Sequence, residues 1–303
     1  MAVGNGMGIG IPMVNLGLGG GGGGGTGFLL DDYPNTIGHS YSLRQLSAST
    51  TNVVRVRRDS DNTEQDFTAA EITDGTLVSF VGAFTSGYVT KWYDQSNSAH
   101  VINFTALQQP RIVSAAGLIL ENGKPCVSFN FALNNSLNVL LNSPYSSQYY
   151  LFAVNSWSAP EEGATYMYGL RTPSPPFLSG DEQSNSISWD GSTGRMKGSG
   201  IIPSTDLTFP RVGTFPQSLY YARQAVGALG SLGSQLKINT TQYPSFGTTD
   251  NGSAQINSIN LAEDGGGGNN SSINLQEFIL YFADPGVNAA AIESNINTHY
   301  SIY

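Results

Sequence analysis

The sequence predicts an all-β protein: a β-sandwich with a C-terminal helix, preceded by a glycine-rich extended segment. Short β-branched and aromatic runs recur from about residue 41 onward, with Gly, Asn and Ser turns between them, as in a sandwich. Charged residues make up 12% of the chain, about half the usual share, which excludes helical bundles and coiled coils. With 14 Phe and 15 Tyr, the chain is too aromatic to be disordered.

The predicted strands are short and of two kinds. Val53–Arg58 alternates apolar and polar residues from Val54, as a half-buried strand does, and a turn follows at Asp59–Asn62. Tyr149–Val154 is continuously apolar, which predicts a central strand buried on both faces. We expect further strands at Tyr88–Tyr93, around Val127, Phe129 and Phe131, and at Thr165–Leu170, Ile187–Trp189, Ser218–Ala222, Gln235–Asn239, Gln255–Leu261 and Glu277–Phe282.

Two helices are predicted. At the C-terminus, Asp284 is suited to cap a helix and Pro285 to occupy its first turn. Ile292, Ile296 and Tyr300 then follow at a spacing of four, which places them on one helix face. A second, short helix is expected over Thr68–Phe80, with Leu77 and Phe80 facing inward.

The N-terminal 27 residues differ in composition from the domain predicted over residues 28–303. Seven consecutive glycines, Gly19–Gly25, form a flexible tether, because glycine loses the most backbone entropy on ordering. The stretch before them is too apolar for a solvated tail. It is either a frayed terminus or an anchor that docks into another subunit. The anchor candidates are Ile9, Ile11, Met13, Val14, Leu16 and Leu18.

Charge and cysteine content exclude several function classes. The net charge of −9 argues against nucleic acid as a partner, since binding to phosphates needs clustered Lys and Arg. The single cysteine, Cys126, excludes an internal disulfide and a multi-cysteine zinc site. No apolar run reaches 18 residues, so no membrane span is expected.

A carboxylate-rich stretch at residues 59–66 has two interpretations. Its Asp-x-Asp spacing is one that a calcium loop uses, with Asp59 and Asp61 as candidate ligands. However, the sixth position is Glu64 instead of Gly, and no Glu stands at the twelfth. Because Arg57 and Arg58 are adjacent, structural ion pairs across a hairpin are the favoured interpretation, and no cofactor is predicted.

Aromatic and polar residues that suit a glycan site occur at three places. In Trp92-Tyr93-Asp94-Gln95-Ser96, Trp92 is a candidate stacking face, with Asp94 and Gln95 as candidate partners for sugar hydroxyls. The alternative is that Trp92 belongs to the core and Asp94 caps the end of a strand. Trp157 and Trp189 lie in or beside loops rich in Asn, Ser and Pro, and are further candidates.

Three stretches carry a family resemblance. They are YSLRQLSASTTNVVRVRRDSDNTEQD at Tyr41–Asp66, YVTKWYDQS at Tyr88–Ser96, and NGKPCVSF at Asn122–Phe129. In this order they resemble the lectin-like domain of the α-L-arabinofuranosidase B catalytic family, over about residues 38 to 303. The resemblance implies a concanavalin-like, jelly-roll β-sandwich. The same module resembles domains of bacteriophage tail, fibre and other virion proteins.

The family's retaining hydrolysis needs two carboxylates about 5 Å apart. By resemblance, Asp264 in Glu263-Asp264-Gly265-Gly266 corresponds to the catalytic acid. The segment that matches the nucleophile strand is Tyr166–Arg171, where Arg171 stands near the position of the expected Glu and no cysteine pair precedes it. Because a cation cannot attack an anomeric carbon, the sequence predicts no enzymatic activity, and Asp264 remains the one catalytic candidate.

The resulting functional prediction is a virion appendage of a tailed bacteriophage. It is attached through its N-terminus to other virion proteins, displays the domain on the virion surface, and binds host surface glycans. A homotrimer is expected by resemblance to fibres, with neither nucleic acid nor membrane as a partner. Two alternatives stay open: a glycoside hydrolase of arabinofuranosidase type, and a capsid decoration protein without a ligand.

Overall fold

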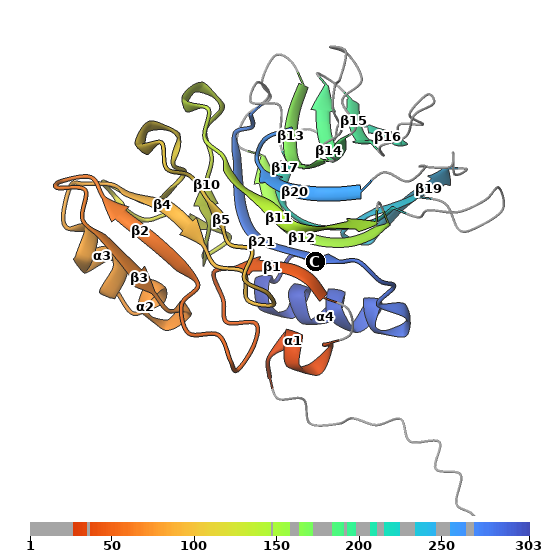
Figure 1. Ribbon diagram of the computed structural model, residues 1–303, viewed down its shortest axis with the longest axis horizontal. Coiled ribbons are helices and arrows are strands. Elements are labelled where there is room, and N and C mark those ends of the chain that lie inside the picture. The colour runs from red at the N-terminus through yellow and green to blue at the C-terminus, as the bar shows by residue number, and fades with distance from the viewer. Residues whose placement is uncertain are drawn as a thin grey trace, which may run out of the picture.

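The computed structural model describes residues 27–34, 37–146, 148–157, 164–171, 184–190, 193–197, 207–210, 215–224, 234–246, 255–264 and 270–303. It confirms the predicted all-β, concanavalin-like sandwich with a C-terminal helix (Figure 1). The predicted anchor, Ile9 to Leu18, and the glycine tether lie outside the described residues. No helix in the described part of the chain is long and apolar enough to span a membrane.

The sandwich consists of two antiparallel leaves, which we name after their central strands. The β20 leaf has the order β5 (Val101–Ile102), β11 (Leu137–Ser146), β20 (Gln255–Leu261), β13 (Ala164–Arg171), β14 (Ser184–Asp190), β15 (Thr193–Lys197), β16 (Leu207–Pro210). In the β21 leaf, β21 (Ile273–Tyr281) is followed by β12 (Tyr149–Trp157), β17 (Phe215–Gln224), β18 (Ser234–Ile238) and β19 (Thr241–Phe246). On its other edge, β21 pairs with β1 (Ile37–Ser42) and β10 (Val127–Ser128).

Strand β4 (Gly87–Trp92) joins the two leaves. Its C-terminal half pairs with β5 of the β20 leaf, and its N-terminal half pairs with β6 (Arg111–Ser114), which continues to β10. On its other edge β4 pairs with β2 (Val54–Arg58), which pairs with β3 (Glu64–Phe67). The short strands β7 (Gly117–Leu118), β8 (Leu120–Glu121) and β9 (Lys124–Pro125) form the hairpins that follow.

The hydrophobic core lies between the leaves. The ring of Tyr168 on β13 packs 5.5 Å from that of Phe278 on β21, and its hydroxyl lies 2.9 Å from that of Tyr149 on β12. Because side chains alternate along a strand, Tyr150, Phe152 and Val154 point to the opposite face of β12. There they meet the C-terminal helix, so all nine residues of β12 are buried. The predicted two-faced burial of this strand is confirmed.

Helix α4 (Ala289–Tyr300) covers the outer face of the β21 leaf, with α1 (Leu29–Asp32) beside it (Figure 1). Ile292, Ile296 and Tyr300 are buried on one face, as their spacing predicts. Asp284 accepts a hydrogen bond from the amide of Gly286. The N-cap of the short 3-10 turn η3 (Gly286–Asn288) that precedes α4 is Pro285, and the N-cap of α4 is Asn288, so the predicted cap of α4 by Asp284 is corrected.

Two sequence-based expectations need correction. The helix expected over Thr68–Phe80 is two helices, α2 (Ala69–Thr73) and α3 (Thr76–Val81), because Gly75 between them has φ +96°. Leu77 is buried, whereas Phe80 is partly buried beneath the Arg58 guanidinium. The strand expected through Phe131 ends at Ser128, because the Asn130 side chain caps the 3-10 turn η2 (Phe131–Leu133). Another 3-10 turn, η1, covers Ala106–Gln108.

A buried ion pair holds β21 to the chain that follows β1. The Glu277 carboxylate is fully buried and receives two hydrogen bonds from the Arg44 guanidinium, at 2.8 and 2.9 Å. Ser42 donates a third, at 2.8 Å, and the Tyr300 hydroxyl of α4 lies 3.3 Å away. Arg44 also donates to Asn295 of α4. One charged pair therefore links β1, β21 and α4.

The connection from β20 to β21 crosses the end of β13 at Gly169. A Cβ atom at Gly169 would lie 2.3 Å from the carbonyl oxygen of Asp264, which no real contact permits. Ala262, just before this crossing, has φ +60° and donates its amide to Met167 on β13. The missing side chain at Gly169 thus allows residues 262–264 to lie directly on the β20 leaf.

We predict that Glu277→Ala lowers the free energy of unfolding by about 3–5 kcal/mol, because the Arg44 charge is left buried without its partner. Urea denaturation measures the change. Asp61→Ala is the control, because it breaks the exposed Arg58–Asp61 pair and should have a much smaller effect. Equal effects of the two substitutions would contradict the role given to the buried pair.

We predict that Gly169→Ala lowers the free energy of unfolding by about 1–3 kcal/mol, since the new methyl group must displace the backbone of Asp264. Ala262→Gly, in the same connection, keeps the left-handed backbone without a side chain and should be tolerated. Thermal denaturation of both variants tests the contact. A Gly169→Ala protein as stable as the parent would show that residues 262–264 do not lie against β13.

Candidate functional site

Glu263 is the described carboxylate that the fold directs into a cavity without engaging it. It is 7% exposed, and no hydrogen bond or ion pair to its carboxylate occurs within the described part of the chain. Its backbone bridges to that of Asn270, and Asn270 donates its side-chain amide to the carbonyl of Asn135. The left-handed Ala262 precedes it, a conformation that costs free energy in a non-glycine residue. The Glu263 oxygens are not among the buried polar atoms without a partner, so they open onto the cavity and are available to a ligand.

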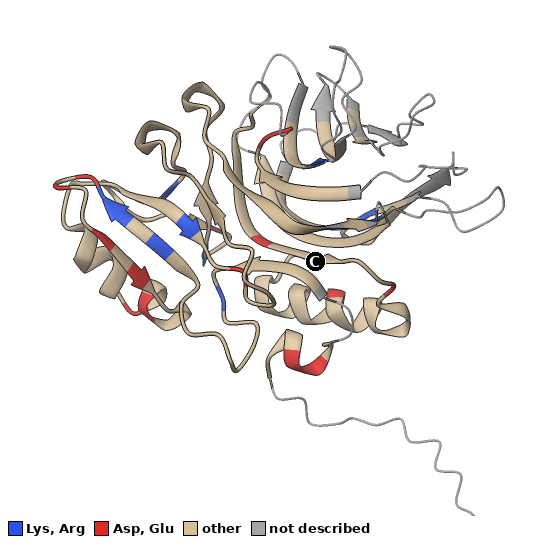
Figure 2. Ribbon diagram, viewed as in Figure 1, with Lys and Arg blue, Asp and Glu red and all other residues tan. Residues whose placement is uncertain are grey.

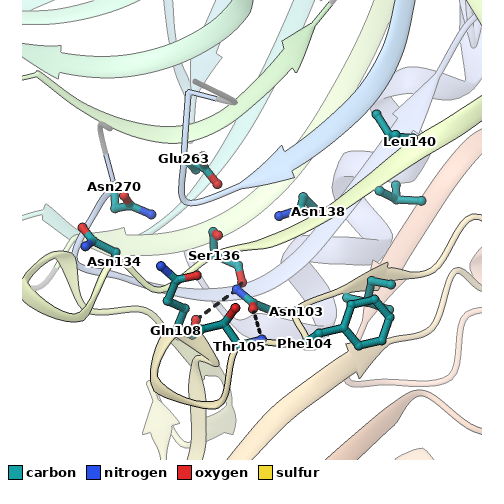
Figure 3. Close-up of a pocket in the computed structure, with 12 residues that line it drawn as sticks. Asn103, Phe104, Thr105, Gln108, Asn134, Ser136, Asn138, Leu140, Glu263 and Asn270 are labelled. Atoms are coloured by element: carbon teal, nitrogen blue, oxygen red, sulfur yellow. Dashed lines mark hydrogen bonds between the residues drawn. The ribbon is translucent and has the colours of Figure 1, made fainter. Parts of the chain in front are cut away.

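The cavity that Glu263 faces has a volume of about 610 Å³, and amide and hydroxyl side chains dominate its polar lining. Figure 3 shows Glu263 and Asn270 across the cavity from the loop that carries Gln108 and Thr105. Asn138 and Ser136 line it from β11 and from the residue just before that strand. Such groups both donate and accept hydrogen bonds, as recognition of sugar hydroxyls requires.

One wall of the cavity is apolar and exposed. Phe104 and Leu140 are 90% and 80% exposed, although both are large hydrophobic side chains. Phe104 extends from the 103–108 loop, and Leu140 extends from β11 (Figure 3). An aromatic face beside amides and hydroxyls is the usual composition of a glycan site, because sugar rings present both C–H and O–H groups.

A chain of buried hydrogen bonds fixes the loop that carries Phe104. Asn103 donates to the carbonyls of Ser136 and Gln108, and accepts from the amide of Thr105. Gln109 donates to the Asn103 carbonyl and accepts from the Arg57 guanidinium. The backbone that carries the exposed Phe104 ring is thus held by buried, hydrogen-bonded side chains. This wall of the cavity is therefore preorganised for a ligand.

The Trp92–Ser96 motif has a structural role instead of the proposed glycan contact. Trp92 is fully buried. Asp94 is 6% exposed and contacts His39 Nδ1 at 2.7 Å and the Ser40 amide at 2.9 Å. Gln95 accepts from the Leu46 amide and donates to the carbonyls of Ser42 and Arg44. These hydrogen bonds connect the end of β4 to β1. The polar atoms of Asp94 and Gln95 that could bind a sugar are therefore already hydrogen-bonded within the protein.

Trp157, the next tryptophan candidate, does not line this cavity. Trp157 ends β12, is 7% exposed, and donates its indole N–H to the Tyr220 hydroxyl at 3.3 Å. The glycan interpretation of Trp157 is therefore corrected to a core role. Trp189 belongs to β14, and its side chain lies outside the described residues.

The proposed calcium loop forms ion pairs instead. The Arg58 guanidinium contacts both oxygens of Asp61, at 2.6 and 2.8 Å, and the Arg57 guanidinium lies 3.7 Å from Asp59. Across the hairpin, Arg55 binds Asp66 through two further hydrogen bonds. The pairing that the sequence favours is therefore present. Within the described ranges, no three His, Cys, Asp or Glu side chains gather as a metal site.

The structure brings together the two segments that resemble the family's catalytic strands, but with a different carboxylate in the cavity. Arg171 donates to the carbonyl of Asp264 at 3.2 Å, so β13 and the 262–264 segment are neighbours, as the resemblance implies. Asp264 is 1% exposed and does not line the described cavity, whereas Glu263 does. Sequence reasoning missed Glu263, because adjacent carboxylates differ only in the direction that the backbone gives them.

Cys126 and His39 are two titratable side chains that do not line the cavity at Glu263. Cys126 is buried, and burial raises the pKa of its thiol to about 12, so it is not a thiolate at neutral pH. The imidazole of His39 is committed to Asp94. Glu263 is therefore the one side chain of the described cavity lining with acid–base chemistry.

Comparison with solved structures supports the fold. A GH54 α-L-arabinofuranosidase mutant soaked with 4-nitrophenyl α-L-arabinofuranoside matches with a TM-score of 0.58 and 14% identity, over 85% of this chain and 62% of that chain. An arabinofuranosidase complexed with arabinofuranosyl-α-1,2-xylobiose matches at 0.53, also with 14% identity, over 85% of this chain and 61% of the other. A Trypanosoma rangeli sialidase matches at 0.48 and 12% identity, over 84% of this chain and 34% of that one.

No protein-family model matches the chain, and no curated protein matches it. This chain spans about three fifths of the arabinofuranosidase chains and about one third of the sialidase chain. The sequence-based prediction of a protein without enzymatic activity needs correction, because the two matches above with a TM-score over 0.5 are arabinofuranosidase structures. The phage context stays a prediction. The chain has a β-sandwich fold like that of the GH54 arabinofuranosidases.

Proposed function

We propose that this protein binds an oligosaccharide in the cavity at Glu263 and hydrolyses a glycosidic bond there. The observation that carries the proposal is the Glu263 carboxylate, which is buried, unpartnered among the described residues and aimed into a cavity of amides and hydroxyls. The exposed ring of Phe104 supplies the apolar face of the site. The fold shared with arabinofuranosidases supports the same choice and makes an arabinofuranoside the first substrate to test.

Glu263 has the role of proton transfer in this proposal. As a carboxylic acid it protonates the departing glycosidic oxygen, and as a carboxylate it then removes a proton from the attacking water. Asn138, Gln108 and Asn270 orient the sugar hydroxyls around it. Glu263 is the one carboxylate of the described lining, so water is the nucleophile that attacks the anomeric carbon in this proposal.

We expect Glu263→Gln to lower the turnover of 4-nitrophenyl α-L-arabinofuranoside by about 10²–10⁴-fold, because the amide cannot transfer a proton. Release of nitrophenol by purified protein measures the rate. Binding of the sugar, measured by calorimetry, should persist because the amide keeps the shape and hydrogen-bonding capacity of the side chain. Asp59→Asn removes an exposed carboxylate outside the cavity and is the matched control.

Three results would contradict all or part of the proposal. If the Glu263→Gln protein kept the parent's turnover, Glu263 would have no part in the reaction. Failure of the unmodified protein to bind any oligosaccharide at millimolar concentration would remove the cavity as a glycan site. Binding without turnover by the unmodified protein would overturn hydrolysis alone.

The virion placement, the trimer and the N-terminal attachment remain predictions, because they concern residues or assemblies outside the described structure. The expected glycan ligand is common to the virion prediction and to the proposed hydrolase. The cavity at Glu263 is where we place that ligand.

A further inference from the structure

A second cavity continues the first one beyond Phe104. It has a volume of about 450 Å³ and shares the residues Ile102, Asn103, Phe104, Val139 and Leu140 with the Glu263 cavity. The shared side chains include the exposed Phe104 and Leu140, which therefore stand between two hollows of one groove. A ligand that stacks on Phe104 reaches both halves, so the groove fits a chain of sugars better than a single one.

The two halves differ in charge. The Glu263 half contains one described carboxylate and no described cation. The second half lies over β2 and β4, where Figure 2 shows the basic residues of this part of the protein. Lys91 of β4 and Arg55 of β2 both line it. An otherwise acidic protein thus places positive charge at one end of the groove.

Lys91 is the cation of this half that remains available to a ligand. Both oxygens of Asp66 accept hydrogen bonds from Arg55, at 2.6 and 2.8 Å, and one of them also accepts from the Tyr93 hydroxyl. The Lys91 ammonium lies 5.2 Å from the centre of the Tyr93 ring, and no carboxylate of the described residues lies within ion-pair distance of it. Lys91 is half-buried, so its charge is partly shielded from water.

An uncharged hydrogen-bond donor, His100, lines the same half as Lys91. His100 accepts the Asp94 amide at Nδ1, which leaves Nε2 as its N–H donor. Burial and the nearby Lys91 lower the pKa of His100, so the imidazole is neutral at pH 7. Glu64 also lines this half, but it is exposed and accepts the Thr90 hydroxyl at 3.3 Å. A ligand carboxylate would therefore bind on the Lys91 side, away from Glu64.

We infer that the groove binds an acidic oligosaccharide, with a neutral sugar at Glu263 and a carboxylate-bearing sugar of the uronic-acid class at Lys91. The carboxylate would pair with the Lys91 ammonium, and Phe104 would stack against the sugars between the two ends. Glu263 disfavours an anionic sugar in its own half, so the charges also set the direction of the chain in the groove. This inference rests on the proposed glycan function and specifies its substrate class.

The test compares uronic-acid-containing oligosaccharides, prepared from pectin and glucuronoxylan, with their carboxyl-reduced forms. We expect the unmodified protein to bind an acidic form more tightly than its reduced counterpart, and added salt to narrow the difference. Lys91→Met keeps most of the aliphatic stem and removes the charge. It should weaken binding of the acidic form about tenfold or more and leave the reduced form unchanged. Lys124→Met, which removes a cation outside the groove, is the matched control.

The outcomes separate this inference from the proposed function. Equal affinity for acidic and reduced forms, or a Lys91→Met protein that binds both like the parent, would overturn the acidic subsite while sugar binding at Glu263 stands. No binding of any form would overturn the proposed function itself. Circular dichroism of Lys91→Met establishes that the fold is intact, since the substituted side chain is only half-buried.

Discussion

The burial of β21 on both faces is the constraint on which the rest of the structure depends. One face of the strand meets the β20 leaf through Phe278 and Leu280, and the other meets α4 through Ile279 and Tyr281. A strand enclosed in this way cannot hydrate its polar side chains, so burial favours those that find a partner in the protein, although the Tyr281 hydroxyl has none among the described residues. Glu277 therefore pairs with Arg44, and this ion pair in turn fixes α4 through Asn295.

The need to pair buried polar groups also explains why Asp94 and Gln95, which the sequence offers as glycan-binding residues, do not line the candidate site. Gln276 is fully buried and donates to three backbone carbonyls, those of Glu121, Lys124 and Pro125. Asp94 and Gln95 bind backbone groups near β1 in the same manner. Buried polar groups with satisfied hydrogen bonds specify one arrangement of the strands, and they have no capacity left for a ligand.

The candidate groove lies where this network ends. Its floor and walls come from the 103–108 loop, the start of β11 and Glu263 in the crossing at residues 262–264. Phe104 and Asn138 are exposed there. The hydrogen bonds of the buried Asn103 and Gln109 fix the backbone of the loop that carries Phe104. Rigid support beneath exposed side chains is what lets a surface groove bind sugars without first being ordered.

The sequence by itself determined the fold class, the two-faced burial of β12, and the inward face of α4. These follow from local periodicity, which the chain carries in residues 149–154 and in the spacing of Ile292, Ile296 and Tyr300. It missed β11, whose Pro144 and asparagines weaken the strand signal, although pairing with β20 and β5 forms that strand. Only the tertiary structure decided that Glu263 instead of Asp264 faces a cavity, and that Lys91 and Phe104 share its groove. These relations depend on backbone direction at Ala262 and on contacts between segments far apart in the chain, which no local pattern encodes.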